Sequence, residues 1–363
     1  MTNVTRKTPN VSRETSEPVR AETFVDTPIA AAAARASEIL TPGGTRPLPR
    51  PVHPRIITVA NQKGGVGKTT TAVNLAAALA IHGLRVLVID LDPQGNASTA
   101  LGIDHRQPDI SSVYELLLGE ATLAEAIQQS PANENLYCVP ATLDLAGAEI
   151  ELVSLVAREN RLKNAINPEA LGAYGFDYVF IDCPPSLGLL TVNAMVAARE
   201  VLIPIQCEYY ALEGVGQLLR NIELVQSHLN RDLHVSTVLL TMYDGRTKLA
   251  DQVSEEVRRH FGDKVLRAVV PRSVKVSEAP GYGMTILDYD PGSRGAMSYV
   301  DAAREVEGAC GRAEEALRRA EALAEGGGDP AKLAAEVAAC ERRLLLQGER
   351  ERLLRASWEV ADP

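Results

Sequence analysis

Short runs of apolar residues alternate with longer helix-like stretches between residue 55 and about residue 305. The short runs are rich in Val, Ile and Leu, which is typical of strands buried on both faces of a sheet. Amphipathic helical stretches lie between them, for example at residues 111–129 and 147–166. Strands are expected at residues 56–60, 85–90, 136–141, 178–182, 200–205, 235–242 and 266–271. The alternation predicts an α/β fold, with a mostly parallel twisted sheet of about seven to eight strands and helices on both faces.

The first expected strand runs directly into the glycine-rich loop NQKGGVGKTT, at residues 61–70. A helical pattern follows, with Ala72, Leu75, Ala76 and Leu79 on one face and a stop at Gly83. A strand, a glycine loop and a helix in this order aim the helix N-terminus and its amides at an anion. The order therefore predicts a phosphate-binding loop in a fold of P-loop NTPase type.

The loop departs from the standard P-loop at its first position. The pattern G-x-x-x-x-G-K-[ST] requires a glycine at position 62, but Gln62 stands there and an extra lysine, Lys63, follows it. Gly67, Lys68 and Thr69 match the end of the pattern, where the lysine contacts phosphate and the hydroxyl contacts Mg²⁺. A tight turn that needs glycine only for its backbone angles is the alternative. Gly-Lys-Thr at the required place favours a nucleotide site.

Two later strands end in acidic residues. Asp90 and Asp92 face one side of an extended strand, and a carboxylate at the position of Asp92 could orient a water near the γ-phosphate. An Asp before a proline is also common as a turn cap, and the motif alone does not decide between the two; the presence of the glycine loop favours the functional interpretation. Asp182 follows four apolar residues in a Walker-B-like arrangement that holds Mg²⁺, often through water. Cys183 has no neighbour that would lower its pKa, which favours a packing role.

Basic residues follow the last two expected strands. Arg246 and Lys248 lie within residues 241–252, and Arg272 and Lys275 lie within residues 269–283. Ordinary solvated charge accounts for most Arg and Lys side chains. Contact with DNA is an equally good interpretation of the pattern alone.

Composition limits how the chain could meet nucleic acid and membranes. The formal net charge of −10 argues against binding nucleic acid by bulk charge, so DNA binding would need a local basic patch completed by oligomerisation. No run of 18 apolar residues occurs, and the N-terminus lacks the apolar core of a signal peptide. The five cysteines are scattered, which favours buried free thiols in a reducing cytosol.

Three segments are expected from changes in composition. Residues 1–54 should form a disordered tail that contains Pro, Ala and Arg, and residues 55–305 the P-loop domain. Residues 306–363 are rich in Ala, Glu and Arg and should form a helical extension, interrupted by GGGDP at 326–330.

Four motifs together resemble the ParA/Soj family of partition ATPases: KGGVGKTT, DLDPQGNAST, FIDCPPSLG and PRSVKVSEAPGYG. The resemblance covers about residues 55–305. It implies an ATP hydrolase that uses ATP and Mg²⁺ and forms a homodimer when ATP is bound. It also implies non-specific DNA binding and the partition of chromosomes or plasmids with a ParB-type partner. Such a protein would be cytoplasmic and nucleoid-associated, without integral membrane association.

The resemblance also implies a role for each matching residue. Lys63 would reach across a two-fold interface to the partner subunit's phosphates, while Lys68 serves its own subunit and Asp92 positions the attacking water. Thr69 would bind Mg²⁺ directly and Asp182 through water. Arg246, Arg272 and Lys275 would contact DNA. Further nucleotide contacts would come from Gly64, Gly65, Val66, Gly67 and Thr70. Pro271 and Ser273 would lie near the adenine base, although the family often has Asn at the position of Ser273.

A MinD-like membrane-surface ATPase for division-site placement is the alternative function. Its support is the C-terminal stretch ERRLLLQGERERLLRASW, at residues 341–358, where leucines and Trp358 lie among five arginines. A basic amphipathic helix of this kind could lie on anionic lipid. A helix that packs on the protein core or on a partner protein is the interpretation that the pattern favours.

Overall fold

The structure is a computed structural model that describes residues 45–107, 109–209 and 213–308, together with Ala34, Ser37 and Lys332. Most of the expected N-terminal tail and most of the expected C-terminal extension lie outside these ranges. The stretch at residues 341–358, on which the membrane-surface alternative depends, lies outside them as well.

One eight-stranded sheet forms the centre of the molecule, in the order β3-β4-β2-β5-β1-β6-β7-β8. Every neighbouring pair is parallel except β3 and β4, which pair antiparallel at one edge. All seven predicted strands are present, and β3 is an addition of two residues. The strands are β1 (Arg55–Val59), β2 (Val86–Asp90), β3 (Gln128–Gln129), β4 (Leu136–Val139), β5 (Tyr178–Asp182), β6 (Glu200–Gln206), β7 (His234–Tyr243) and β8 (Val265–Pro271).

Helices cover both faces of this sheet, as the continuous apolar strands require. Successive residues of β2 show the two layers, because Val86 and Val88 pack on one face while Leu87 and Ile89 pack on the other. The first face carries α2 (Lys68–Ile81), α3 (Asn96–Ala100), α12 (Val274–Glu278), α13 (Ile286–Tyr289) and a helix over residues 294–308.

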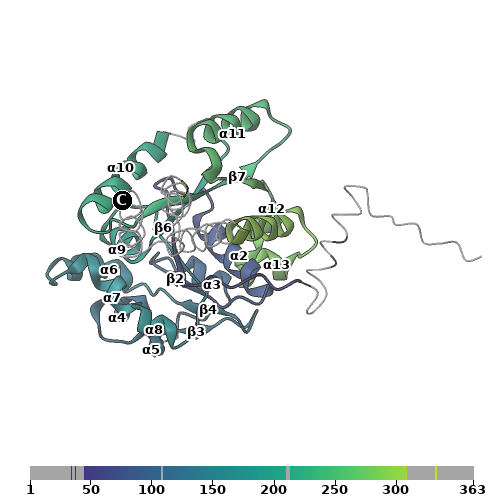
Figure 1. Ribbon diagram of the computed structural model, residues 1–363. Coiled ribbons are helices and arrows are strands. Elements are labelled where there is room, and N and C mark those ends of the chain that lie inside the picture. Colours follow the sequence, from purple (N-terminus) through teal and green to yellow (C-terminus); the bar gives the residue numbers. More distant parts are fainter. Residues whose placement is uncertain are drawn as a thin grey trace, which may run out of the picture.

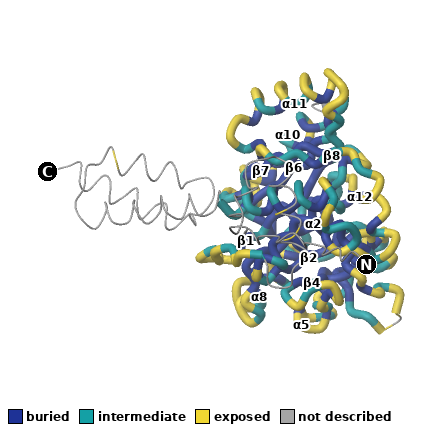
Figure 2. Tube along the Cα trace, turned by 90° about the vertical axis from the view of Figure 1, so that its right-hand side faces the viewer, coloured by how far each residue is buried: buried dark blue, intermediate teal, exposed yellow. Residues whose placement is uncertain are grey.

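The opposite face carries the other α-helices of the described residues, and Figure 1 shows the two sets on either side of the strands. They are α4 (Val113–Leu118), α5 (Leu123–Ala126), α6 (Leu145–Val153), α7 (Arg161–Ala165), α8 (Pro168–Gly172), α9 (Leu189–Ala197), α10 (Glu213–His228) and α11 (Lys248–Phe261). Short 3-10 helices occupy Arg158–Asn160, Gly262–Lys264 and Ala279–Tyr282. In Figure 2 the strands form the buried centre, and exposed residues gather on outer helices such as α5, α8 and α11.

Helix α2 follows the glycine loop as predicted and is buried on nearly all sides. Its buried positions include Lys68 at its first turn and every residue from Thr71 to Ala80. A helix buried all round needs small side chains where it meets its neighbours, which explains the run of alanines. The helix ends where Gly83 takes a φ of +85°, at the predicted stop.

The folded chain begins earlier than residue 55, where the tail was expected to end. The Leu48 amide donates a hydrogen bond to the His82 carbonyl at 3.1 Å, and the Leu48 side chain packs on the core. The Thr45 hydroxyl donates to the Ile81 carbonyl. These contacts satisfy carbonyls at the end of α2 that have no partner inside the helix.

A buried ion pair joins β1 to β6. The Arg55 guanidinium donates to both Glu200 oxygens, at 2.7 and 2.6 Å, and to the carbonyl of Val306 at 2.8 Å. Burial alone would raise the pKa of Glu200, but the charge and hydrogen bonds of Arg55 lower it to about 2. The same guanidinium therefore fixes the helix over 294–308 to the first strand.

We predict that Glu200→Gln lowers the free energy of unfolding by about 3–5 kcal/mol, because it removes the carboxylate charge that pairs with the buried Arg55 guanidinium. Since the pKa of Glu200 is depressed from 4.5 to about 2, its contribution is complete above pH 4.5 and is lost as the pH falls toward 2. Urea unfolding at several pH values measures both effects. The double variant Arg55→Met, Glu200→Leu is the control and should be closer to wild type than Glu200→Gln. A double variant less stable than Glu200→Gln would contradict this account.

Candidate functional site

The carboxyl ends of the parallel strands bring the predicted site residues to one edge of the sheet. Asp182, the last residue of β5, is in register with Val59 at the end of β1 and with Asp90 at the end of β2. The glycine loop leaves β1 at this edge. Ligands of open α/β sheets bind at the carboxyl ends of the strands, so this is where a ligand is expected.

The glycine loop is held from two sides. Gly67 takes a left-handed φ of +87° just before α2, and its carbonyl accepts a hydrogen bond from the Thr71 amide at 2.8 Å. The Thr241 hydroxyl, at the end of β7, donates to the Val66 carbonyl at 2.8 Å. Sequence reasoning did not find Thr241, because this contact joins positions far apart in the chain. A loop fixed in this way leaves its amides turned toward an anion.

Lys68 begins α2 inside the protein. Burial lowers the pKa of its ammonium, and the negative charges of Asp182 and Asp92 act in the opposite direction. A buried ammonium at the first turn of a helix that follows a glycine loop can bind a polyanion.

Asp182 has both carboxylate oxygens buried, and neither has a hydrogen-bond partner within the described part of the chain. Burial, and next the charge of Asp90, raise the pKa of Asp182 well above its usual range. The nearby Thr69 hydroxyl and the Lys68 charge act in the opposite direction and lower the pKa of Asp182. The Thr69 hydroxyl is not placed to make a well-formed hydrogen bond to either Asp182 oxygen. Buried polar atoms normally have partners, so an unpartnered carboxylate next to a hydroxyl suits a hard cation.

Mg²⁺ fits this donor set. It prefers oxygen ligands, and proteins often hold it with one or two carboxylates or hydroxyls while substrate phosphates and water supply the rest. Among the described residues, no group of three His, Cys, Asp or Glu side chains could hold a metal without such help.

Asp90 and Asp92 have different surroundings. Asp90 is fully buried and accepts hydrogen bonds from the amide and hydroxyl of Ser98, at 2.8 and 2.7 Å, while burial raises its pKa to about 6. It also accepts from the Asp92 amide at 3.1 Å and so fixes the loop that carries Asp92. Asp92 is half-buried, and one of its oxygens caps the turn through the Gln94 amide. Asp92 therefore does cap the turn, and its carboxylate also lies close enough to Lys68 to raise the pKa of that lysine.

Two residues predicted near the base lie against the glycine loop. Pro271 ends β8, and Ser273 follows it; both line a cavity of about 120 Å³ together with Gly67, Thr70 and Thr241. The structure therefore brings Pro271 and Ser273 to the start of α2, far from them in the sequence.

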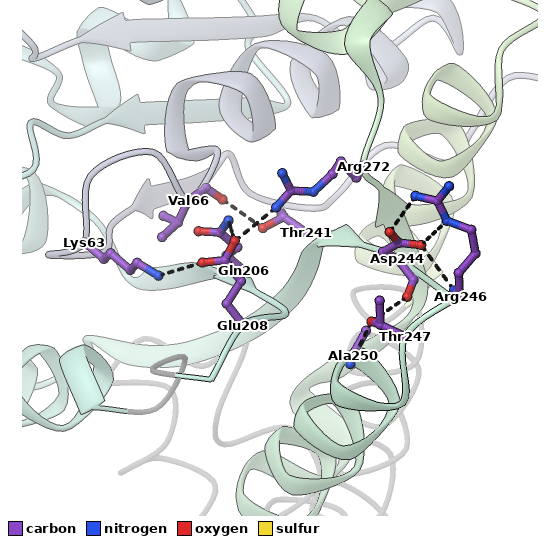
Figure 3. A network of polar contacts seen from close by, with 10 residues as sticks. All are labelled: Lys63, Val66, Gln206, Glu208, Thr241, Asp244, Arg246, Thr247, Ala250 and Arg272. Carbon is purple, nitrogen blue, oxygen red and sulfur yellow. Dashed lines mark hydrogen bonds and ion pairs between the residues drawn. The ribbon is translucent and has the colours of Figure 1, made fainter.

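The predicted DNA-contacting cations follow β7 and β8 at the same edge. Each has a carboxylate partner in its own chain: Arg246 pairs with Asp244 at 2.7 Å, Arg272 with Glu208 at 3.0 Å, and Lys275 with Asp290. Figure 3 shows the first two pairs beside the Val66–Thr241 contact. The three cations are exposed, and exposed ion pairs contribute only about 0–1 kcal/mol, so a phosphate could replace the carboxylates.

Comparison with known proteins places the chain in a family. A family model described as an AAA domain matches residues 54–235. The sporulation initiation inhibitor protein Soj of Bacillus subtilis is 56% identical over 252 residues, which are 69% of this chain and 98% of that protein. The chromosome partitioning protein ParA of Caulobacter vibrioides is 53% identical over 253 residues, or 69% of this chain and 93% of the relative. The chain belongs to the Soj/ParA family of chromosome-partitioning ATPases.

A solved structure supports the same type of fold. Cobyrinic acid a,c-diamide synthase from Mycobacterium smegmatis, with bound ADP and magnesium, has a TM-score of 0.60 and 41% identity, covering 69% of this chain and 93% of its own. The predicted P-loop NTPase fold and the predicted ATP hydrolase activity are therefore confirmed at the level of the family. No helix among the described residues is long and apolar enough to cross a membrane.

Lys68→Ala should weaken ATP binding about 10- to 100-fold, because hydrogen bonds to charged groups contribute about 1.5–3 kcal/mol. Titration with a fluorescent ATP analogue measures the change. Lys163→Ala is the matched control, because Lys163 is exposed on α7, on the opposite face of the sheet. Equal affinity for ATP in the two variants would contradict the placement of the phosphates at Lys68.

Proposed function

We propose that this ATPase is a nucleotide-controlled DNA-binding protein that acts as a homodimer in partition. ATP binds first, two ATP-bound chains associate, and the dimer then binds DNA without sequence preference. A ParB-type partner stimulates hydrolysis of ATP to ADP and phosphate, which releases the DNA. The observation that carries the proposal is that the glycine loop and three exposed cations share one edge of the sheet.

The first part of the proposal concerns the nucleotide. Lys68 and the amides of Gly64, Gly65, Val66, Gly67 and Thr70 hold the phosphates, while Pro271 and Ser273 contact the base. Thr69 holds Mg²⁺, and Asp182 does so through water. The bound ion would neutralise charge on the β- and γ-phosphates. The buried, unpartnered carboxylate of Asp182 supports this assignment.

The second part concerns hydrolysis and the dimer. Lys63 lies at the start of the loop with 38% of its side chain exposed, whereas Lys68 is buried. The loop thus has one inward lysine for its own subunit and one outward lysine that can reach a second. Lys63 supplies positive charge to the transferring phosphoryl group of the partner subunit. Asp92, held by Asp90 at the end of β2, orients the attacking water.

The third part concerns DNA. Arg246, Arg272 and Lys275 lie on neighbouring strand ends, so a dimer would double them into one cationic surface. A local surface of this kind is needed because the chain as a whole carries a net charge of −10. The names of the relatives support partition as the process and, with it, a cytoplasmic location on the nucleoid. The MinD-like alternative depends on residues outside the described ranges.

DNA binding measured with ATP, with ADP and without nucleotide tests this proposal. Duplexes of unrelated sequence should bind with similar affinity in ATP, and much more weakly in the other two states. Equal binding in all three states would contradict the proposal. Co-sedimentation with anionic vesicles in ATP, without any DNA binding, would favour the membrane-surface alternative.

Lys63→Ala should leave ATP binding within about threefold of wild type. Lys63 contributes its charge to the ATP bound by the partner subunit and not to the ATP bound by its own subunit. The ATP-dependent dimer and ATP hydrolysis should both be lost. Light scattering in ATP measures the dimer, and phosphate release measures hydrolysis. Lys163→Ala again serves as the control. A normal ATP dimer in Lys63→Ala would show that this lysine does not act across the interface.

Reversing the charge in Arg246→Glu, Lys275→Glu should weaken DNA binding and leave ATP-driven dimerisation intact. Each lost phosphate contact flattens the log–log dependence of affinity on salt by roughly one unit, and a dimer loses four such contacts. Salt titrations with unrelated duplexes measure the slope. The control Arg259→Glu, Lys163→Glu changes net charge equally, with both residues exposed away from the strand ends. The same slope in both double variants would place the DNA surface elsewhere.

A further inference from the structure

Glu208 contacts two cations to which different tasks are assigned above. One carboxylate oxygen, Oε2, lies 3.4 Å from the Lys63 ammonium, and the other, Oε1, lies 3.0 Å from the Arg272 guanidinium. Gln206 Nε2 also donates to Oε1, at 2.6 Å. Figure 3 shows the carboxylate between the glycine loop and the end of β8. A single side chain therefore links the start of the nucleotide loop to the cationic edge.

The backbones that carry these three residues are fixed. The Lys63 amide donates to the Asn61 side chain at 3.0 Å, and the Asn61 amide group donates to the Pro204 carbonyl at 2.8 Å. The Cys207 amide, next to Glu208, donates to the backbone carbonyl of Thr241 at 3.1 Å, and the Arg272 amide donates to the backbone carbonyl of Tyr243 at 3.0 Å. The side chains are much freer, since Lys63, Glu208 and Arg272 are 38%, 44% and 58% exposed. The ion pairs can therefore break by rotation of side chains, without refolding of a loop.

The two tasks require both cations to leave Glu208. Lys63 cannot contact the partner subunit's phosphates while its ammonium pairs with a carboxylate of its own chain. Arg272 likewise exchanges Glu208 for a DNA phosphate before it can contribute to DNA affinity. The same carboxylate thus competes with the nucleotide phosphates for one cation and with DNA for the other.

We propose that Glu208 is a positioning residue that holds Lys63 and Arg272 within the nucleotide-free subunit and so suppresses both dimerisation and DNA binding in that state. This inference rests on the proposed function, because it uses the tasks given there to Lys63 and Arg272. The suppression is modest, since each pair is exposed and contributes about 0–1 kcal/mol. Ion pairs of this strength are weak enough for ATP-driven dimerisation to break the pair with Lys63 and for DNA to break the pair with Arg272.

Glu208→Gln tests the proposal with a readout that a purely structural role would not produce. DNA affinity without nucleotide, measured at about 50 mM salt, should rise about two- to fivefold, whereas damage to the fold would lower it. The ATP concentration that gives half-maximal dimerisation should fall by a similar factor. Glu208→Asp keeps the charge and should stay closer to wild type in both measurements.

The control for net charge is Glu223→Gln. Glu223 is exposed on α10, and its side chain contacts neither cation in the structure. This variant makes the same change in net charge, so any gain from bulk electrostatics appears in it as well.

A double-mutant cycle separates the two cations. The gain in nucleotide-free DNA affinity should persist when Glu208→Gln is combined with Lys63→Ala, and should disappear when it is combined with Arg272→Gln. Equal DNA affinity in Glu208→Gln and Glu223→Gln, or a gain that survives Arg272→Gln, would overturn the proposal. Failure of the proposed function is a different result, because wild type would then bind DNA equally with and without ATP.

Discussion

The buried carboxylate of Asp182 is the constraint around which this edge of the sheet is organised. Removing a carboxylate from water is costly unless a cation or hydrogen-bond donors compensate, and neither oxygen of Asp182 has a donor within the described residues. Burial and Asp90 accordingly raise the pKa of Asp182. The compensating charges come from Lys68 and, in the proposed function, from Mg²⁺ and its nucleotide. In the proposed function, the charge of Asp182 is therefore fully compensated only when the ion and the nucleotide are bound.

The topology explains why nucleotide binding and the exposed cations are physically close. Because β5, β1, β6, β7 and β8 are consecutive neighbours and all parallel, their carboxyl ends form one continuous edge. Asp182 ends β5, the glycine loop follows β1, Glu208 follows β6, and Arg272 follows β8. The Thr241 hydroxyl then joins the end of β7 to the loop itself. From β1, the loop is one strand position away from Glu208, two from Arg246 after β7, and three from Arg272 after β8.

The sequence was a good guide wherever local patterning decides the structure. The apolar runs predicted all seven long strands, and the pattern around Gly67-Lys68-Thr69 predicted the glycine loop and the helix that follows it. The stretch at 111–129 was less predictable, because Gly119 at φ +81° ends α4 and a new capping box at Thr122 and Glu125 begins α5. The contacts of Ser98 with Asp90, Thr241 with Val66 and Glu208 with Lys63 were not found. They join positions that only the folded sheet brings together, and no local pattern indicates them.

The central claim is that the nucleotide site and the DNA surface are coupled, and reciprocal binding tests it most directly. The affinity for a non-hydrolysable ATP analogue is measured by calorimetry, first without DNA and then with a saturating duplex. Thermodynamic linkage requires DNA to raise the analogue's affinity by the same factor by which the analogue raises the affinity for DNA. We predict a factor well above one that is equal in both directions. An unchanged affinity for the analogue in saturating DNA would show that the two sites are independent and would contradict the account.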